Sequence, residues 1–525
     1  MSIPQSAIHV CSNVRLNSRY EHTIYFADRT EQLNYFAGKV VKTFSAYSFI
    51  RKSWDLNVAA TMEEAASWSY LYFTNTANGK RYFYFIDNIE YVNDGTVRLK
   101  LQIDVLQTYL FDFELLPCFI ERQHTPTDAI GDNTIDEGLE LGELVSIGST
   151  DIPMGEMVIL LMSTIVPHES TDPDLEEPVK VKGSYYNGIY NGVGIFGSDA
   201  AQWRNVSDIL HILDTNNFSD GIMAIWMYPK KLVTFEDNPD LVMRPVKAIE
   251  PFFEDFTRPP VLAGGYFPRN NNLFTYPFNQ LYFTNNTGGA ASFAYERFGD
   301  PTACNFKITG ALSPEGKVRA YPLNYAGEQH AYEHGLTLDG FPNCAWNQDV
   351  YKLWLAQNQN QQDLSLGLAA LSIAGGVGSM ALTGGAGAVL GMGSVIGGAQ
   401  TIASILAQRK DQQLQPPQAK GTPSTSINTV AGFQTFTVKN KCVDAQHARI
   451  IDDYFTMYGY KLNRVDTPNI RARNSHTYIK TVGCHIEADL CNEDATKIES
   501  IFDNGVTFWT DGDRIGQYND NNNPL

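Results

Sequence analysis

Residues 82–109 read YFYFIDNIEYVNDGTVRLKLQIDVLQTY, and this stretch indicates the fold class of the chain. Two runs rich in aromatic and β-branched residues, 82–86 and 97–109, flank Asn93-Asp94-Gly95, a pattern typical of a β-hairpin. The second run alternates Val97, Leu99, Leu101, Ile103 and Val105 with Arg98, Lys100, Gln102 and Asp104. This alternation predicts a strand that packs one face and turns the other toward water or a neighbouring molecule.

Composition extends this interpretation to the rest of the chain. Aromatic residues make up 12% of the 525 positions, and such enrichment favours sheets over helix bundles. The length allows roughly three or four domains of about 100–200 residues each. We therefore expect a β-rich, multidomain α+β protein, with an N-terminal domain at 1–125 and β-rich middle domains at 126–345.

The C-terminal region, 427–525, carries the most regular pattern. The expected elements are a strand at 435–443, a helix at 445–458, strands at 460–465 and 478–488, a helix at 492–503 and a strand at 506–509. This is the βαββαβ order. We expect Asn492 to cap the second helix and Gly505 to end it. A small sheet of this kind has open edges, which are either protected or paired with another subunit.

Between these regions lies an inserted loop and linker, 346–426, which contains an unusual apolar segment. Residues 364–408 include eleven glycines and no charged or aromatic side chain. A membrane-spanning helix takes about 20 apolar residues, so the segment has room for two spans joined at Thr383-Gly384-Gly385. Its glycines and glutamine-rich flanks are untypical of a permanent anchor and favour conditional insertion.

The apolar side chains of this segment are the predicted membrane-contacting residues. They are Leu364, Leu366, Leu368, Leu371, Ile373, Val377, Met380, Leu382, Val389, Leu390, Met392, Val395, Ile396, Ile402, Ile405 and Leu406. Two G-x-x-x-G spacings favour close helix packing in lipid and hence an oligomer. The first is formed by Gly387 and Gly391, and the second by Gly393 and Gly397. The alternatives are a flexible glycine-rich linker and an internal hairpin of small-residue helices.

The net charge of −19 argues against a general nucleic-acid-binding surface, because affinity for phosphates comes from Lys and Arg. It is compatible with duplex DNA as non-specific cargo, because acidic channel walls repel its phosphates and let it slide. The same charge could equally serve only to keep the protein soluble. Residues 123–179 hold thirteen Asp and Glu and no Lys or Arg, so we expect them to face solvent or a lumen. Seven scattered Cys suggest reduced thiols made in a cytoplasm, and the first residues resemble no secretion signal.

Local motifs predict no catalytic, cofactor-binding or metal-binding residue, and we expect no enzyme. The G-x-G-x-x-G match at 192–197 follows a turn-like stretch instead of a buried strand. His476, Cys484, His485 and Cys491 have no zinc-finger spacing. Asp136-Glu137 and Asp511-Gly512-Asp513 lack a full calcium loop. Ten dispersed His form no cluster in the sequence that would indicate an acid trigger.

Several islands of sequence resemble one known family. They are IDVLQTYLFD (103–112), residues 119–124, NTIDEGL (133–139), YGYKLNRV (458–465), PNIR (468–471) and IFDNGVT (501–507). In this order they resemble the tail knob, or distal tail tube, proteins of small short-tailed phages (podoviruses similar to Picovirinae) that infect Gram-positive bacteria. Residues 145–345 show no such motif.

The resemblance implies a homohexameric tube at the distal end of a short tail, with β-barrel walls from the N- and C-terminal parts. It implies partners among other tail proteins, and apolar loops that plug the lumen. In that family these loops insert in the host membrane and form a channel for the genome, and 364–408 occupies the corresponding position. A tail-associated cell-wall hydrolase and a host-receptor adhesin are the alternative functions.

Overall fold

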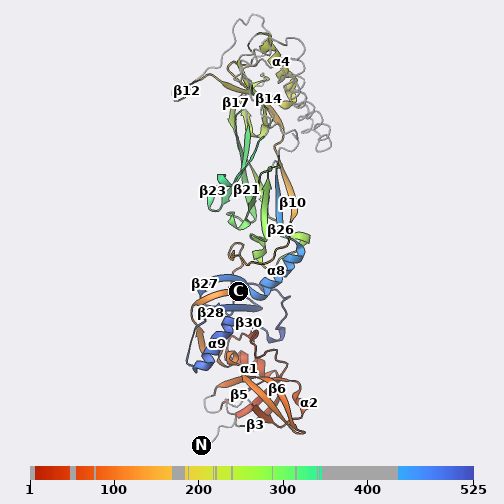
Figure 1. The fold of residues 1–525 in the computed structure, drawn as a ribbon, viewed down its shortest axis with the longest axis vertical. Coiled ribbons are helices and arrows are strands. Elements are labelled where there is room, and N and C mark those ends of the chain that lie inside the picture. The colour runs from red at the N-terminus through yellow and green to blue at the C-terminus, as the bar shows by residue number, and fades with distance from the viewer. Residues whose placement is uncertain are drawn as a thin grey trace, which may run out of the picture. The chain divides into compact units, whose positions relative to one another are not determined.

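The structure is a computed structural model of the whole chain, and its ribbon is coloured by residue number in Figure 1. It describes residues 6–47, 55–75, 79–167, 184–186, 189–216, 218, 221–237, 241–286, 288–313, 316–339, 341, 343–345 and 435–525. The chain divides into two compact units. Unit 1 comprises Met1–Leu144, Val261–Phe278 and Val443–Leu525, and unit 2 comprises Val145–Pro260 and Asn279–Cys442. Residues 261–278, expected in the middle domains, thus belong with the two ends of the chain.

The first sheet of unit 1 is built around the predicted hairpin. It is antiparallel, in the order β3-β1-β5-β6-β7-β4. Its strands are β1 (Ser6–Ser12), β3 (Val40–Tyr47), β4 (Asp55–Val58), β5 (Trp68–Thr74), β6 (Arg81–Asn93) and β7 (Thr96–Ile103). Val97, Leu99 and Leu101 are buried, which confirms the alternation. Helices α1 (Arg29–Ala37) and α2 (Met62–Ala65) connect its strands.

The predicted strand over 97–109 ends early, because its last five residues form helix α3 (Val105–Tyr109). Asp104, expected on the exposed face, is 1% exposed and caps this helix by accepting from the Gln107 N–H. The Tyr70 hydroxyl donates to the same carboxyl group at 2.8 Å. Burial raises the pKa of Asp104 to about 6. The helix-capping role therefore outweighs the strand periodicity at this position.

The second sheet of unit 1 combines both ends of the chain. Its order is β2-β30-β28-β9-β27, with β2 parallel to β30. The strands are β2 (His22–Ile24), β9 (Cys118–Gln123), β27 (Tyr460–Asp466), β28 (His476–Val482) and β30 (Val506–Trp509). Helices α8 (Ala445–Tyr458) and α9 (Asn492–Asn504) complete this region. Strand β9 lies between β27 and β28, so an N-terminal strand is inserted into the C-terminal pattern.

The predicted C-terminal elements are present in their expected order, but they do not form a self-contained βαββαβ unit. Strand β26 (Thr435–Val443) pairs with β19 (Asn279–Thr284) in unit 2. The predicted strand 478–488 is interrupted after Val482, and β29 (Ile486–Ala488) pairs with β8 (Phe113–Leu115). Local sequence patterns indicate where strands form along the chain. Which strands pair with one another is decided by tertiary packing.

The ends of α9 correct one predicted cap and confirm another. The N-cap is Cys491, because the backbone N–H groups of Asp494 and Ala495 both donate to its carbonyl oxygen at 3.1 Å. Asn492 is therefore the first residue of the helix and not its cap. Gly505 ends the helix with φ of 94°, a conformation that favours glycine.

A single core joins the two ends of the chain in unit 1. Its buried residues from the N-terminal part include Ile24, Tyr70 and Phe83, and those from the C-terminal part include Phe502 and Trp509. The Tyr109 hydroxyl also donates to Asp494 at 2.7 Å. The other face of the first sheet packs a separate cluster that includes Val10, Leu71, Tyr84 and Leu99. The two parts of unit 1 therefore bury one apolar cluster jointly, and the N-terminal part buries the other by itself.

The described residues of unit 2 form mostly β-sheet. One sheet has the order β16-β17-β14-β11-β15-β25, a second β18-β21-β22-β23 with β24 on β22, and a third β10-β26-β19-β20. The strands are β10 (Leu144–Pro153), β11 (Met157–Ser163), β12 (Ser184–Tyr186), β13 (Ile189–Asn191), β14 (Gly194–Asp199), β15 (Ile222–Pro229), β16 (Val233–Phe235), β17 (Arg244–Ile249), β18 (Phe252–Thr257), β20 (Ala290–Phe293), β21 (Ala303–Ala311), β22 (Lys317–Tyr325), β23 (Glu328–His330), β24 (Leu336–Leu338) and β25 (Asn343–Ala345). Helix α4 (Trp203–Thr215) accompanies them. The chain is thus β-rich, as predicted.

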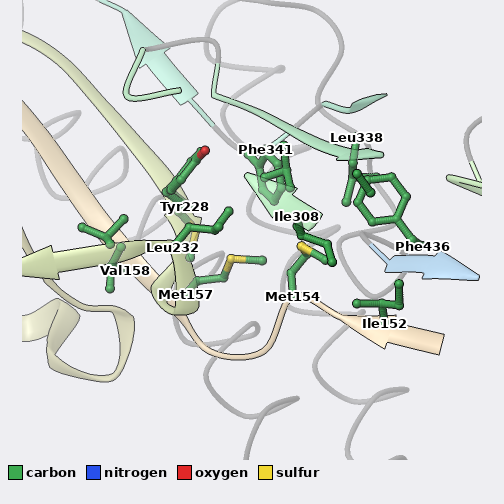
Figure 2. Close-up of a cluster of buried hydrophobic side chains, with 14 of the residues drawn as sticks. Ile152, Met154, Met157, Val158, Tyr228, Leu232, Ile308, Leu338, Phe341 and Phe436 are labelled. Carbon is green, nitrogen blue, oxygen red and sulfur yellow. The ribbon is translucent and has the colours of Figure 1, made fainter. Parts of the chain in front are cut away.

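The core of unit 2 is apolar and continuous. Figure 2 shows Met154, Met157, Tyr228 and Phe341 gathered with aliphatic side chains from several strands. Stacked aromatic rings extend this core, because Phe283 lies 4.9 Å from Phe306 between ring centroids. Among the helices in the described part of the chain, none combines the length and apolarity that a membrane span requires.

Gly459, between α8 and β27, sits where a side chain has no room. Its φ is 65° and a Cβ atom would lie 2.4 Å from the backbone of Gln123 and His124 in and just beyond β9. Gly483 has a similar φ of 67°, with open space around it. We predict that Gly459→Ala lowers the free energy of unfolding by about 3 kcal/mol or more, and Gly483→Ala by only about 1–2 kcal/mol.

Urea unfolding of the two variants measures this difference. Equal losses of stability in the two variants would show that the backbone contact between Gly459 and β9 does not constrain unit 1.

Candidate functional site

The predicted membrane-contacting residues, 364–406, lie outside the described residues, as does the rest of 346–434. The predicted helix-packing glycines lie outside them too: Gly387, Gly391, Gly393 and Gly397. The structure does describe the strands on either side of this stretch. Strand β25 precedes it and pairs with β15, with Cys344 opposite Ile225. Strand β26 follows it and pairs with β19 from Cys442 to Thr437. Both ends of the stretch are therefore held in antiparallel sheets of unit 2.

Strand β26 is anchored by packing as well as by its ladder. Phe436 is fully buried, and its ring stacks on Phe283 with 5.2 Å between centroids. The Thr437 hydroxyl donates to Asp151 on the neighbouring strand β10 at 2.6 Å. Lys441 places its ammonium 3.5 Å from the centre of the Tyr282 ring. These contacts hold β26 in place at the C-terminal end of the apolar stretch.

Unit 1 contains a buried polar junction centred on Asp452 of α8. The Asp452 side chain is fully buried and accepts from the Tyr266 hydroxyl at 2.6 Å and from the Asn270 amide side chain at 2.7 Å. The backbone N–H groups of Arg269 and Asn270 donate to it at 2.9 and 3.1 Å. A carboxylate with this many donors fixes the segment 261–278 against α8.

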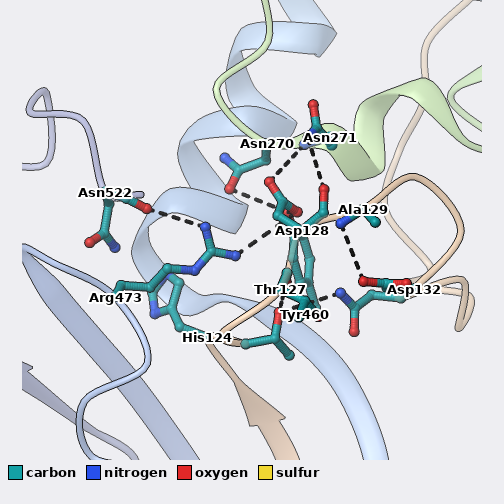
Figure 3. Close-up of polar contacts among 12 residues, drawn as sticks. His124, Thr127, Asp128, Ala129, Asp132, Asn270, Asn271, Tyr460, Arg473 and Asn522 are labelled. Carbon is teal, nitrogen blue, oxygen red and sulfur yellow. Dashed lines mark hydrogen bonds and ion pairs between the residues drawn. The ribbon is translucent and has the colours of Figure 1, made fainter. Parts of the chain in front are cut away.

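A second buried carboxyl group, Asp128, lies beside this junction (Figure 3). It accepts from the Tyr460 hydroxyl at 2.5 Å and from the Asn271 N–H at 3.2 Å. Arg473 lies 3.9 Å from it and donates to the Asn522 carbonyl oxygen at 3.2 Å. Burial nevertheless raises the pKa of Asp128. The junction therefore joins the N-terminal part, the segment 261–278 and the C-terminal residues.

A polar cavity of about 300 Å³ opens at this junction. Its lining residues are His124, Asp128, Arg269, Asn270, Asn271, Thr456, Arg473 and residues 520–524. Within this lining Arg473 pairs with Asp128, whereas Arg269 and Asp520 pair with charged residues outside it. The Arg473 Nε and Nη2 atoms are buried without a hydrogen-bond partner, so the polar cavity is suited to ordered water. Within the described ranges, no three His, Cys, Asp or Glu side chains are arranged to hold a metal ion.

Histidines that are distant in the sequence meet in unit 1. The rings of His124 and His476 lie 5.3 Å apart, and both Nε2 atoms approach the Thr456 carbonyl oxygen, at 3.1 and 2.8 Å. His476 also stacks on Trp509, which contacts His22. These histidines are dispersed in the sequence, and the sheet brings them together because it joins segments from both ends of the chain.

The histidine pair is held in its neutral form. The Tyr478 N–H donates to His124 Nδ1 at 2.8 Å, so that nitrogen carries no proton and Nε2 donates to Thr456. Burial lowers the pKa of His124 well below 6.5, and the neighbouring His476 and Arg473 lower it further. Burial likewise lowers the pKa of His476. Protonation therefore disfavours the folded state.

The sites rejected from the sequence have structural roles. His485 contacts Glu499 at 2.9 Å, whereas His476 lies in the aromatic cluster, so these histidines are not brought together. Gly197 belongs to β14, where a Cβ atom would meet the Phe235 ring at 2.5 Å. The Asp511 carboxylate accepts from the Asp513 N–H and caps a short 3₁₀ turn, Gly512–Arg514.

The acidic stretch 123–179 is not uniformly exposed as expected. Asp128 is largely buried, and the Glu137 side chain is 2% exposed. Glu137 pairs with Arg122 of β9 and accepts from the Lys461 N–H at 2.9 Å. An acidic stretch in a sequence predicts exposure to solvent. Asp128 and Glu137 are largely buried instead, because each accepts a hydrogen bond from strand β27, which is remote in the sequence.

One signal in the sequence could have located the polar junction. The buried stripe of α8 comprises Ala448, Ile451, Asp452 and Phe455, at the i, i+3, i+4, i+7 spacing. A charged residue on such an apolar stripe is unusual unless it is paired. The remaining members, Tyr266 and Asn270, lie in a stretch with no periodic pattern.

Comparison with known proteins agrees with this architecture. Residues 246–523 match the family model of the C-terminal domain of tail knob protein gp9 of Bacillus phage phi29. Residues 4–114 match the N-terminus of the caudoviral major tail protein. The chain is 26% identical to tail knob protein gp9 of Bacillus phage B103, covering 98% of both chains, and 27% identical to that of Bacillus phage PZA, covering 97% of both.

A solved structure supports the fold. The tail knob protein gp12 of bacteriophage C1 superimposes with a TM-score of 0.63 over 97% of this chain and 98% of that one, at 13% identity. The fold and the sequence matches together define a structural protein of a phage tail. The chain belongs to the family of tail knob protein gp9 of the phi29-type Bacillus phages.

Membership in this family confirms the resemblance and the expectation that the chain is not an enzyme, because the named relatives are structural proteins. The chain is a component of the virion tail and interacts with other tail proteins.

The buried carboxylate of the junction has a matched surface neighbour. Asp453 is 64% exposed and pairs with Arg269, whereas Asp452 is buried and accepts from several donors. We predict that Asp452→Asn lowers the free energy of unfolding by about 3–5 kcal/mol, because an amide NH₂ would face donors. Asp453→Asn should cost at most about 1 kcal/mol. Chemical denaturation measures both, and a small loss for Asp452→Asn would contradict the junction's role.

The histidine pair predicts a dependence of stability on pH. Because the folded-state pKa values lie below 6.5, the unfolded state binds more protons as pH falls below about 6.5, and the free energy of unfolding decreases. We predict that His124→Gln, which keeps one donor and one acceptor, reduces the loss between pH 7 and 5.5 by about 1 kcal/mol.

The matched control is His485→Gln, because His485 is exposed. Thermal unfolding of wild type and both variants at the two pH values tests the prediction, and Asp104 contributes equally to all three. An unchanged pH dependence in His124→Gln would contradict it.

Proposed function

We propose that this tail component is a homohexameric distal tube that conducts double-stranded DNA, and that its apolar segment 364–408 plugs the lumen before genome ejection. On infection the segment leaves the tube, inserts in the host membrane and forms the channel for the genome. Self-association, the host membrane and DNA as non-specific cargo are parts of this proposal. Family membership supplies the tail location from which it starts.

The observation that carries the proposal is the bracketing of the apolar segment by β25 and β26. Both strands are paired in sheets of unit 2, so the uncharged stretch is tethered at each end. A tethered segment can change its surroundings without leaving the tail. Eleven glycines dilute its apolarity, which favours a segment that exchanges between two environments over one held permanently in lipid.

Close packing of several copies of the segment is part of the proposed channel. The glycine pairs at i and i+4, Gly387 with Gly391 and Gly393 with Gly397, allow helix backbones to approach one another in lipid. Their role stays a prediction, because these four residues lie outside the described part of the chain.

The same proposal assigns roles to the four expected regions. The N-terminal region 1–125 and the C-terminal region 427–525 form the β-barrel wall of the tube, and 346–426 is the membrane-active loop with its linker. The shared core of unit 1 supports the joint role of the two ends, because one buried cluster takes its residues from both of them. The middle region, 126–345, carries strands β10–β25, of which β25 precedes the loop, and β26 of the C-terminal region follows it.

The charge of the chain supports a DNA conduit. Each copy carries a net charge of −19, and acidic walls repel phosphates and so keep a passing duplex from adhering. DNA is then cargo that the protein contacts weakly, not a ligand that it recognises.

Deletion of residues 364–408 tests the membrane role. We predict that the deletion abolishes leakage of dye from lipid vesicles, because it removes the uncharged stretch, and leaves the assembly intact, because β25 and β26 keep their partners. A matched control replaces 364–408 with a Gly/Ser stretch of equal length, which keeps the connection but removes the apolar side chains.

Vesicle leakage and negative-stain images of sixfold rings are the two measurements. Leakage by the deleted protein equal to that of the full chain would reject this segment as the membrane-active part.

A further inference from the structure

Three exposed apolar side chains form one row across neighbouring strands of the second sheet of unit 1. Phe119 of β9 lies opposite Val465 of β27 on one side and opposite Val482 of β28 on the other. Their exposed fractions are 37%, 71% and 55% respectively. Residues that face one another across adjacent strands share a face of the sheet, so the three side chains form a continuous apolar surface. We call it the β9 row.

The β9 row is a part of its sheet face that the helices leave open. Closer to α8, the same face is covered, because Arg122 lies over the Tyr454 ring at 4.7 Å and Tyr478 packs edge-on against Tyr458. The three side chains of the β9 row do not belong to the buried apolar clusters of unit 1. Three neighbouring apolar side chains left open on one sheet face give a partner an apolar surface to contact.

The row ends on strand β27, an edge of the sheet. The first half of this edge is protected, because the Lys461 N–H donates to the buried Glu137 carboxylate. Residues 463–466, which include Val465, are all exposed. An exposed edge strand beside an apolar row offers both backbone groups and apolar surface to a partner.

The charges around the row indicate the kind of partner. Glu121 pairs with Lys480 at 2.9 Å, and Arg464 pairs with Asp466 at 3.2 Å. Each of these pairs is neutral, and the Lys461 ammonium at the edge donates to the carbonyl oxygen of Asp136, a residue that carries a carboxylate of its own. The chain as a whole has a net charge of −19, but the charges around the row largely cancel. An acidic molecule, such as another copy of the chain, can therefore approach this region without strong repulsion. A nucleic acid would need a clear excess of cations.

We propose that the β9 row and the exposed edge of β27 form the contact surface for a second copy of this chain. This inference rests on the proposed oligomeric tube and assigns one of its contact faces. The row meets a different surface of the next copy, because a head-to-tail contact of this type closes into a ring. In a chain of net charge −19 that surface is expected to be acidic. Desolvation of the apolar row supplies affinity, and the neutralised pairs at its rim permit the approach of two acidic chains.

Charged substitutions in the row test the proposal in the full-length chain. Val465→Glu places a negative charge against the acidic partner and is expected to raise the dissociation constant for self-association at least tenfold. Val465→Lys should raise it less, because the added charge is attracted to the partner. Val465→Thr retains β propensity and should raise it a few-fold through loss of apolar contact.

The matched control is Val41→Glu. Val41 is 52% exposed on β3, which is also an edge strand of unit 1, but it lies outside the row. The dissociation constant of this variant should stay within twofold of wild type. Mass photometry and analytical ultracentrifugation measure assembly, and circular dichroism with thermal unfolding checks that each variant is folded.

Each remaining outcome has a separate meaning. Rings that form equally well in folded Val465→Glu and wild type would overturn the inference while leaving the tube intact. A wild type that stays monomeric would overturn the inference and the proposed oligomer together. Normal rings without vesicle leakage would reject only the membrane part of the proposed function. Duplex DNA binding that depends on Val465, without self-association, would reassign the row to nucleic acid and overturn the inference.

Discussion

The insertion of β9 between β27 and β28 is the constraint on which unit 1 depends. A strand that pairs on both sides satisfies its backbone groups only when both neighbours are present. Strand β9 lies in the N-terminal third of the chain and its neighbours lie near the C-terminus, so the two parts of unit 1 form one sheet. Gly459 permits this arrangement, because its missing side chain leaves room for the backbone at Gln123.

The same insertion determines where the charged and polar groups of unit 1 are placed. Arg122 of β9 reaches the carboxylate of Glu137, and His124, just beyond β9, meets His476 of β28. Asp452 then holds the segment 261–278 onto α8. Buried polar groups of this kind are stable only when each finds its partner, so they also specify a single arrangement of these chain segments. The histidine pair adds a sensitivity to acid that opposes the effect of burying Asp104.

Unit 2 has a different role, because its sheets hold both ends of the stretch that contains the apolar segment. Strands β25 and β26 belong to separate sheets, and each is one member of a regular antiparallel pair. For a member of the tail knob family, this design separates two tasks. The shared sheet and core unite the chain ends in unit 1, while unit 2 holds the strands before and after a segment that is rich in glycine and carries no charged or aromatic residue.

The sequence by itself determined the β-rich class, the hairpin of β6 and β7, the order of the C-terminal elements and the likeness to tail knob proteins. These features are local: they depend on alternation, turn residues and short motifs. Tertiary structure alone decided that β26 pairs in unit 2, that β9 enters the C-terminal sheet, and that Asp104, Asp128 and Glu137 are buried. The strands that pair with β9 and β26 are remote in sequence, as are Tyr460 beside Asp128 and Lys461 beside Glu137, whereas Asp104 caps its own helix through Gln107. No local pattern records which remote strands will pair, because pairing depends on the apolar area that all segments bury together.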